Sequence, residues 1–203
     1  IDNQLAMIVP AILAFGGEGV TSAIQRAINE GDVLLVVSMD RVDDWDADQC
    51  VEVELVRADG RPTVGGLGLI EPGQTFDRDD DKPASLVEDA TIEDGWVTAG
   101  PVALELPMQI SGFDLFLSVR DATLKYTVEE DGSMRGFIAG SLVVEEMLEL
   151  LDEIEDGTDV LQGIRKVVKD NADLDPGPDG ECRRLSLAVE FRAVPAFLFP
   201  ESS

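Results

Sequence analysis

The spacing of hydrophobic residues near the start of the chain predicts two helices. Residues 2–15 form an apolar segment, and Pro10 inside it either kinks the helix or begins a second turn. Apolar residues then recur at helical spacing over residues 20–28, and Gly31 closes this second helix. The continuous apolar run at residues 32–39 changes the pattern, because it is typical of a strand buried on both faces.

Alternating hydrophobic and polar residues predict a sheet in the middle of the chain. Residues 51–58 alternate as an antiparallel neighbour of the first strand would. The pattern becomes β-rich again from Trp96, and Asp131-Gly132 predicts a hairpin between the last two strands of this region. The strands predicted here cover residues 96–99, 102–110, 113–120, 122–130 and 134–140.

Three further segments complete the predicted layout. Residues from about 60 to 95 hold clustered glycine, proline and aspartate, and predict a long acidic loop that is either functional or poorly ordered. Residues from about 143 to 170 carry two apolar stripes and predict a helical hairpin, with Gly157-Thr158 as its turn and N-cap. The closing segment 184–199 is typical of a strand interrupted at Pro195, whose second half should lie at a sheet edge.

Together these elements predict an α+β fold built as one domain over residues 1–203. We expect a mainly antiparallel sheet, with the N-terminal helices and the C-terminal helical hairpin packed on it. A regular strand–helix–strand alternation is missing, which argues against a doubly wound parallel sheet. The sequence contains no apolar run of roughly eighteen residues, so it predicts no transmembrane segment.

Composition narrows the function classes. The chain has 42 acidic and 15 basic residues, a net charge of −27. Such a chain repels phosphate backbones, so we expect no nucleic-acid partner. The acidity is interpreted as solubility or salt adaptation, with cation binding as the alternative. Histidine is absent, which excludes Ser-His and Cys-His nucleophile pairs and removes the usual zinc ligand.

The two cysteines occupy similar places in the pattern. Cys50 follows an Asp-rich loop and opens an alternating segment, and Cys182 follows a loop rich in proline and glycine ahead of another. If these strands are neighbours at one end of a sheet, the thiols can pair, and we predict a Cys50–Cys182 disulfide. Closing so long a loop would stabilise the fold by roughly 4–5 kcal/mol. Two free thiols are the alternative.

The predicted disulfide favours an oxidising compartment. The chain also starts at Ile1 without a methionine, as a mature or trimmed protein would. We therefore expect an extracytoplasmic protein that is periplasmic, secreted, or anchored to the outer membrane through a lipidated cysteine upstream of Ile1.

An acidic cluster inside the predicted loop is the candidate metal site. Its carboxylates stand at positions 1, 3, 5 and 12, as in an EF-hand calcium loop: Asp77, Asp79, Asp81 and Glu88. Lys82 stands where that loop needs glycine, and the flanking residues do not look helical. The segment thus predicts either a calcium site or a solvated acidic loop. Two weaker acidic turns, at residues 44–48 and 173–181, leave the same alternatives open.

Four stretches carry a resemblance to a group of known domains: Asp2-Asn3-Gln4-Leu5, Ile28-Asn29-Glu30-Gly31-Asp32-Val33-Leu34-Leu35, Met134-Arg135-Gly136-Phe137-Ile138-Ala139-Gly140 and Ala193-Val194-Pro195-Ala196. Together they resemble uncharacterised secreted or lipoprotein domains of myxobacterial type. The resemblance spans most of the chain and implies an exported location. Its motifs are structural, so it implies no catalytic residue.

The leading functional hypothesis is a non-enzymatic domain of the cell envelope that acts by binding or scaffolding. The first alternative is a carrier that holds an apolar, lipid-like ligand in a cavity between helices and sheet. The second is a hydrolase that uses paired carboxylates. A cavity would favour the carrier hypothesis. A cleft with two facing carboxylates would favour the hydrolase, and a filled core with flat surfaces would favour the scaffold.

Overall fold

The computed structural model describes residues 3–14, 20–82, 84–110, 113–153 and 159–199. This part of the chain is mostly sheet, with four helices, as the predicted α+β class requires. Where the sequence predicts one domain, the contacts divide the chain into two compact units. The first unit comprises Ile1–Ile24, Leu104–Ala122 and Ala139–Val189; the second comprises Gln25–Ala103, Thr123–Ile138 and Glu190–Ser203.

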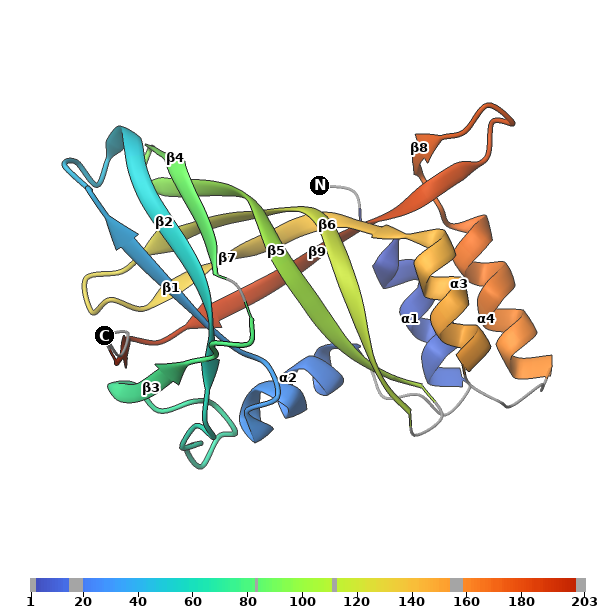
Figure 1. The fold of residues 1–203 in the computed structure, drawn as a ribbon, viewed down its shortest axis with the longest axis horizontal. Helices are drawn as coiled ribbons and strands as arrows, with labels where there is room; N and C mark the ends of the chain where they lie inside the picture. Colours follow the sequence, from blue (N-terminus) through green and yellow to red (C-terminus); the bar gives the residue numbers. More distant parts are fainter. Residues whose placement is uncertain (1–2, 15–19, 83, 111–112, 154–158, 200–203) are drawn as a thin grey trace. The chain divides into compact units, whose positions relative to one another are not determined.

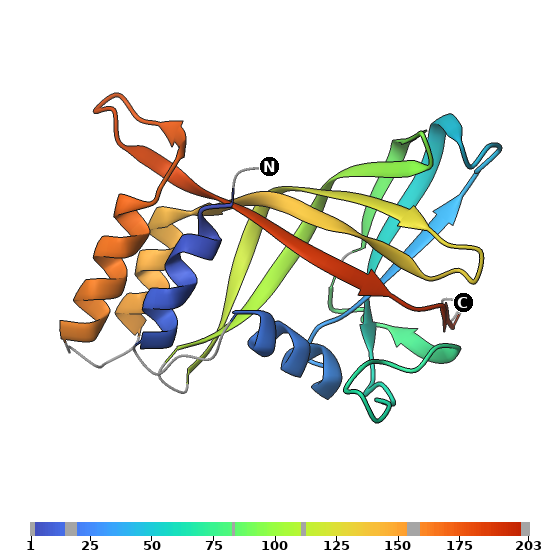
Figure 2. The ribbon, with the colours of Figure 1, turned by 180° about the vertical axis from the view of Figure 1, so that it is seen from behind.

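The first unit contains three helices that lie side by side in both views (Figures 1 and 2). They are α1 (Leu5–Ala14), α3 (Val144–Glu153) and α4 (Asp159–Asp170). Helix α4 contacts both α1 and α3. Each helix has an apolar face, and the buried residues on these faces include Ile8, Met147, Leu151, Ile164 and Val168. The helical hairpin predicted at 143–170 thus corresponds to α3 and α4, while its predicted turn, Gly157-Thr158, lies outside the described residues.

The N-terminal end of α1 is held by strand β9 (Cys182–Ala193). The Asn3 side chain donates to the backbone oxygen of Ala188 over 2.7 Å, and the backbone N–H of Gln4 donates to Ser186 Oγ over 3.1 Å. Ser186 is buried, and these contacts satisfy a hydroxyl that would otherwise be costly to bury. Strand β8 (Leu174–Pro176) pairs antiparallel with the start of β9.

Long strands run from one unit into the other. They are β5 (Trp96–Ile110), β6 (Phe113–Val128), β7 (Met134–Val143) and β9. Strands β5 and β6 are each continuous, whereas the sequence predicts a break near Pro101 in one and near Asp121 in the other. Asp121 has a positive φ of 53°, which is irregular for a strand, but β6 continues through it. The predicted Asp131-Gly132 hairpin is confirmed, because Gly132 turns with a φ of 81° between β6 and β7.

The second unit begins with most of α2 (Val20–Glu30), and Gly31 follows its last residue and closes the helix as predicted. Gly31 has a φ of 89°, and an added Cβ there would lie 2.3 Å from the backbone oxygen of Gly60. Strand β1 (Leu34–Asp40) then pairs antiparallel with β2 (Ala47–Asp59), also as predicted. A small core forms around Leu34, Ala58 and Phe76.

The predicted loop at about 60–95 is wrong over much of its length. It contains two strands, β3 (Gln74–Arg78) and β4 (Ser85–Glu93). Strand β3 buries Phe76, and β4 buries Val87, Ala90 and Ile92. Most exposed positions of the two strands are acidic or polar, and proline and glycine lie close to each strand. The few buried apolar residues therefore do not stand out in the sequence.

The hydrogen-bonded strand order is β10-β3-β2-β4-β5-β6-β7-β9-β8, with β1 joined to β2. Strand β10 (Ala196–Leu198) pairs parallel with β3, so the sheet is mixed. Pro195 separates β9 from β10, and β10 ends the order, which confirms the predicted interruption and edge position. Within the described residues, no helix has both the length and the apolarity needed to cross a membrane.

Candidate functional site

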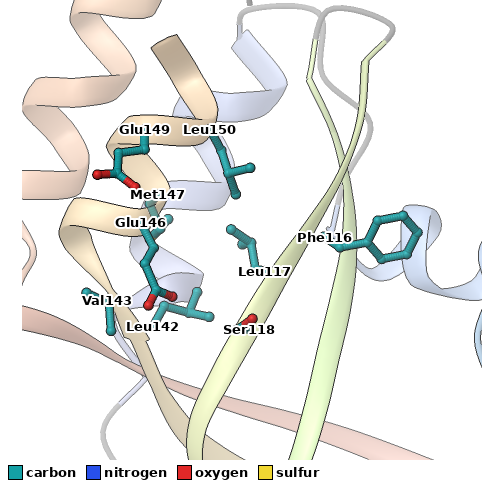
Figure 3. A pocket seen from close by; sticks show the side chains of 9 residues that line it. All are labelled: Phe116, Leu117, Ser118, Leu142, Val143, Glu146, Met147, Glu149 and Leu150. Atoms are coloured by element: carbon teal, nitrogen blue, oxygen red, sulfur yellow. The ribbon is translucent and has the colours of Figure 1, made fainter. Parts of the chain in front are cut away.

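A half-open pocket of about 210 Å³ lies in the first unit, between α3 and the strands β6 and β7 (Figure 3). Three segments line it, and all belong to the same unit. The lining residues are Phe116, Leu117 and Ser118 of β6, Leu142 and Val143 of β7, and Glu146, Met147, Glu149 and Leu150 of α3.

The local structure explains why apolar side chains meet at this place. Strand β7 ends at Val143 and α3 begins at Val144, so strand and helix follow each other without a loop. Strand alternation turns successive side chains of β6 to opposite faces. Leu117 is therefore buried and points toward Leu150, while the ring of Phe116 points the other way and is 44% exposed (Figure 3).

The polar groups of the pocket are a hydroxyl and two carboxylates. Glu146 and Glu149 stand one helical turn apart on α3, and Ser118 lies on β6 next to the inward-pointing Leu117. Arg120, two residues further along β6, donates from Nη2 to Glu146 Oε1 over 2.5 Å. Glu146 is thus paired, whereas Glu149 is exposed and has no ion-pair partner in the described part of the chain. The pocket combines an apolar wall with an acidic rim.

Sequence reasoning does not find this pocket. It identifies the apolar stripe of α3 through Met147 and Leu151, and it allows a cavity between helices and sheet as the alternative to core packing. It does not place such a cavity at Phe116–Ser118. Leu150 is the available signal, because it is an apolar residue beside the core stripe and remains half-buried. Which strand faces that residue depends on tertiary packing.

The four candidate calcium ligands lie on two strands and the turn between them. Asp77 is on β3, Asp79 and Asp81 are in the turn, and Glu88 is on β4; all but the half-buried Asp79 are exposed. The Asp79 carboxylate accepts a hydrogen bond from the backbone N–H of Asp81 over 3.1 Å, and so shapes the turn. Among the residues that the structure describes, no group of three or more acidic or cysteine side chains is placed to hold a metal. The calcium site stays a prediction.

The acidic turn at residues 44–48 is organised by Asp48. Its carboxylate accepts hydrogen bonds from the backbone N–H groups of Asp43 over 2.8 Å and of Cys50 over 3.1 Å. These bonds favour the charged form and hold the pKa of Asp48 below its usual value. At residues 173–181, Asp173 likewise accepts from the backbone N–H of Ser186 over 2.8 Å. Both turns use carboxylates to satisfy backbone groups.

The two cysteines belong to different units. Cys50 is exposed within β2, a strand that begins at Ala47, while Cys182 is half-buried and opens β9 as predicted. The pairing of β2 with β4 shifts register on either side of Val51, so Cys50 lies beside an irregularity of the ladder. Both thiols are free in the structure. The expectation that the two strands are neighbours is wrong, because β4, β5, β6 and β7 lie between β2 and β9 in the strand order. The disulfide itself stays a prediction.

Comparison with known proteins adds no relative: no family model, curated protein or solved structure matches the chain.

Proposed function

We propose that the chain is a non-enzymatic binding domain of the cell envelope, and that its pocket between α3 and β6 takes a small apolar ligand. One observation carries the proposal. The buried residues Leu117, Leu142 and Met147 and the half-buried Leu150 back a half-open hollow whose surface is shared by apolar and polar atoms. A concave site backed by apolar side chains and edged by a few polar groups is the usual form of a small-ligand site, so this hollow favours binding over a flat scaffold surface.

The size of the pocket supports a small ligand. An apolar cavity of roughly 150 Å³ is enough to bind benzene, while sites for drug-sized ligands begin near 300 Å³. At about 210 Å³ the pocket suits one ring or a short alkyl chain. This narrows the lipid-like ligand of the carrier hypothesis to a single short apolar group.

Titration calorimetry with 1-octanol tests the proposal. We expect saturable binding of one octanol per chain. Leu150→Trp should reduce the affinity at least tenfold, because the larger side chain fills the hollow. Leu174→Trp makes the same exchange at an exposed position of β8 and should leave the affinity unchanged. Absence of saturable binding to the folded wild type would contradict the proposal and favour the scaffold hypothesis.

The proposed extracytoplasmic location has its own test, the intact mass of the chain purified under non-reducing conditions. The predicted disulfide lowers the mass by two hydrogens and shields Cys50 and Cys182 from alkylation until a reductant is added. Two freely alkylated thiols in protein from an oxidising compartment would contradict the disulfide and remove the main support for export.

A further inference from the structure

We infer that the pocket selects apolar ligands with a positive charge, such as short alkylammonium ions, over carboxylic acids of the same length. The inference rests on the proposed function, because it assigns the head group of the ligand whose apolar part enters the pocket. Its basis is the set of charged groups at the rim.

Both ionisable groups that line the pocket are carboxylates, Glu146 and Glu149. The neighbouring cation is Arg120, whose guanidinium already contacts Glu146. That pair is close to neutral, and the exposed Glu149 leaves the rim with an excess negative charge. A ligand ammonium group can donate to the Glu149 carboxylate while its alkyl chain lies against Leu150.

An anionic head group would be repelled by the carboxylates at the rim. The carboxylate of a fatty acid would have to stand beside Glu149, or displace Glu146 from Arg120 and leave that glutamate unpaired. The net charge of −27 adds a long-range repulsion for anions and an attraction for cations. Local and global electrostatics therefore favour the same sign of ligand.

The test compares octylammonium, 1-octanol and octanoate, which share a chain length and differ in head-group charge. The affinities are measured by titration calorimetry at pH 7 in 0.15 M NaCl. Octylammonium should bind most tightly and octanol with intermediate affinity. Octanoate should bind at least fivefold more weakly than octylammonium. Octanoate binding as tightly as octylammonium would overturn the inference but leave the proposed function standing. Failure of all three ligands would instead contradict the proposed function itself.

Two variants separate the rim from the overall charge of the protein. Glu149→Gln should weaken octylammonium binding about two- to fivefold, the range of an exposed ion pair, and leave octanol binding unchanged. Glu181→Gln removes the same charge at an exposed position outside the pocket lining, and should change neither affinity. Equal weakening by both variants would show that the overall field, and not the rim, sets the preference, and would overturn the assignment of Glu149.

Discussion

Glu54 of β2 and Arg78 of β3 form a two-pronged ion pair. Arg78 Nη1 lies 2.9 Å from Glu54 Oε1, and Nη2 lies 2.8 Å from Oε2. Their side chains are only 25% and 24% exposed, and Ser38 of β1 adds a hydroxyl 3.4 Å from Oε2. The pair thus links three strands of the second unit, and the guanidinium holds the pKa of Glu54 below its usual value.

Glu54→Gln should lower the free energy of unfolding by about 1–2 kcal/mol at pH 7, since it breaks charge-assisted hydrogen bonds in a half-buried place. Because the folded-state pKa is depressed, this stabilisation is present above the unfolded pKa near 4.5 and is lost as the pH falls below it. Urea unfolding at pH 7 and pH 3 should therefore show a difference between wild type and variant that shrinks in acid.

Glu52→Gln provides the control for this prediction. Glu52 pairs with Arg41 over 3.1 Å, but the Arg41 side chain is 68% exposed, so the change should cost less than about 1 kcal/mol. A loss at Glu52 as large as that at Glu54 would contradict the role given to the enclosed pair.

Tyr126 is fully buried on β6, and its ring packs against Phe191 with 6.3 Å between centroids. Its hydroxyl has no hydrogen-bond partner within the described residues, and burial raises the pKa of the phenol. Tyr126→Phe should leave the free energy of unfolding unchanged or raise it by up to about 1 kcal/mol, because it removes an unsatisfied polar group. Urea unfolding provides the measurement, and a loss above about 1 kcal/mol would show that the hydroxyl has a partner.

At the scale of elements, Gly136 on β7 decides how closely β6 approaches. A Cβ at this buried position would lie 2.2 Å from the backbone oxygen of Lys125 and 2.5 Å from Tyr126 Cβ. Gly136→Ala should therefore force β6 and β7 apart and lower the free energy of unfolding by about 2–3 kcal/mol, a range typical of overpacking.

Gly66→Ala is the matched control, because a Cβ at that exposed loop position meets nothing within 4 Å. It should change the free energy of unfolding by less than about 0.5 kcal/mol. Thermal unfolding of both variants checks the pair, since each kcal/mol moves the melting temperature by about 2–4 °C in a chain of this size. A melting temperature of Gly136→Ala equal to that of Gly66→Ala would contradict the close approach.

Sequence patterns recover the elements unevenly. The strand at 34–40 and the end of α2 at Gly31 carry strong local signals, and both are confirmed. Strand β3 has five residues and β4 carries acidic residues at outward positions, so neither stands out from the turn-rich composition around it. For such short strands the sheet partner, and not the local pattern, supplies most of the stabilisation.

At the scale of the whole molecule, the net charge of −27 makes folding dependent on salt. Self-repulsion opposes the compact state, and salt screens it. Raising NaCl from about 10 mM to 100 mM shortens the Debye length from about 30 Å to 10 Å. The melting temperature should rise by several degrees over this range and change less beyond it. Scanning calorimetry at several NaCl concentrations measures the effect, and a flat profile would contradict it.

The sequence by itself determined the charge, the missing histidine, the α+β class and the boundaries of the strongly patterned elements, because each depends on composition or on local spacing. It left the disulfide and the calcium site as predictions. Tertiary structure decided the pocket, since the burial of Leu117, the orientation of Leu150 and the pairing of Glu146 with Arg120 join residues of β6 and α3 that are distant in sequence. Local spacing fixes which face a side chain takes, but only the packing of strand against helix fixes what lies opposite.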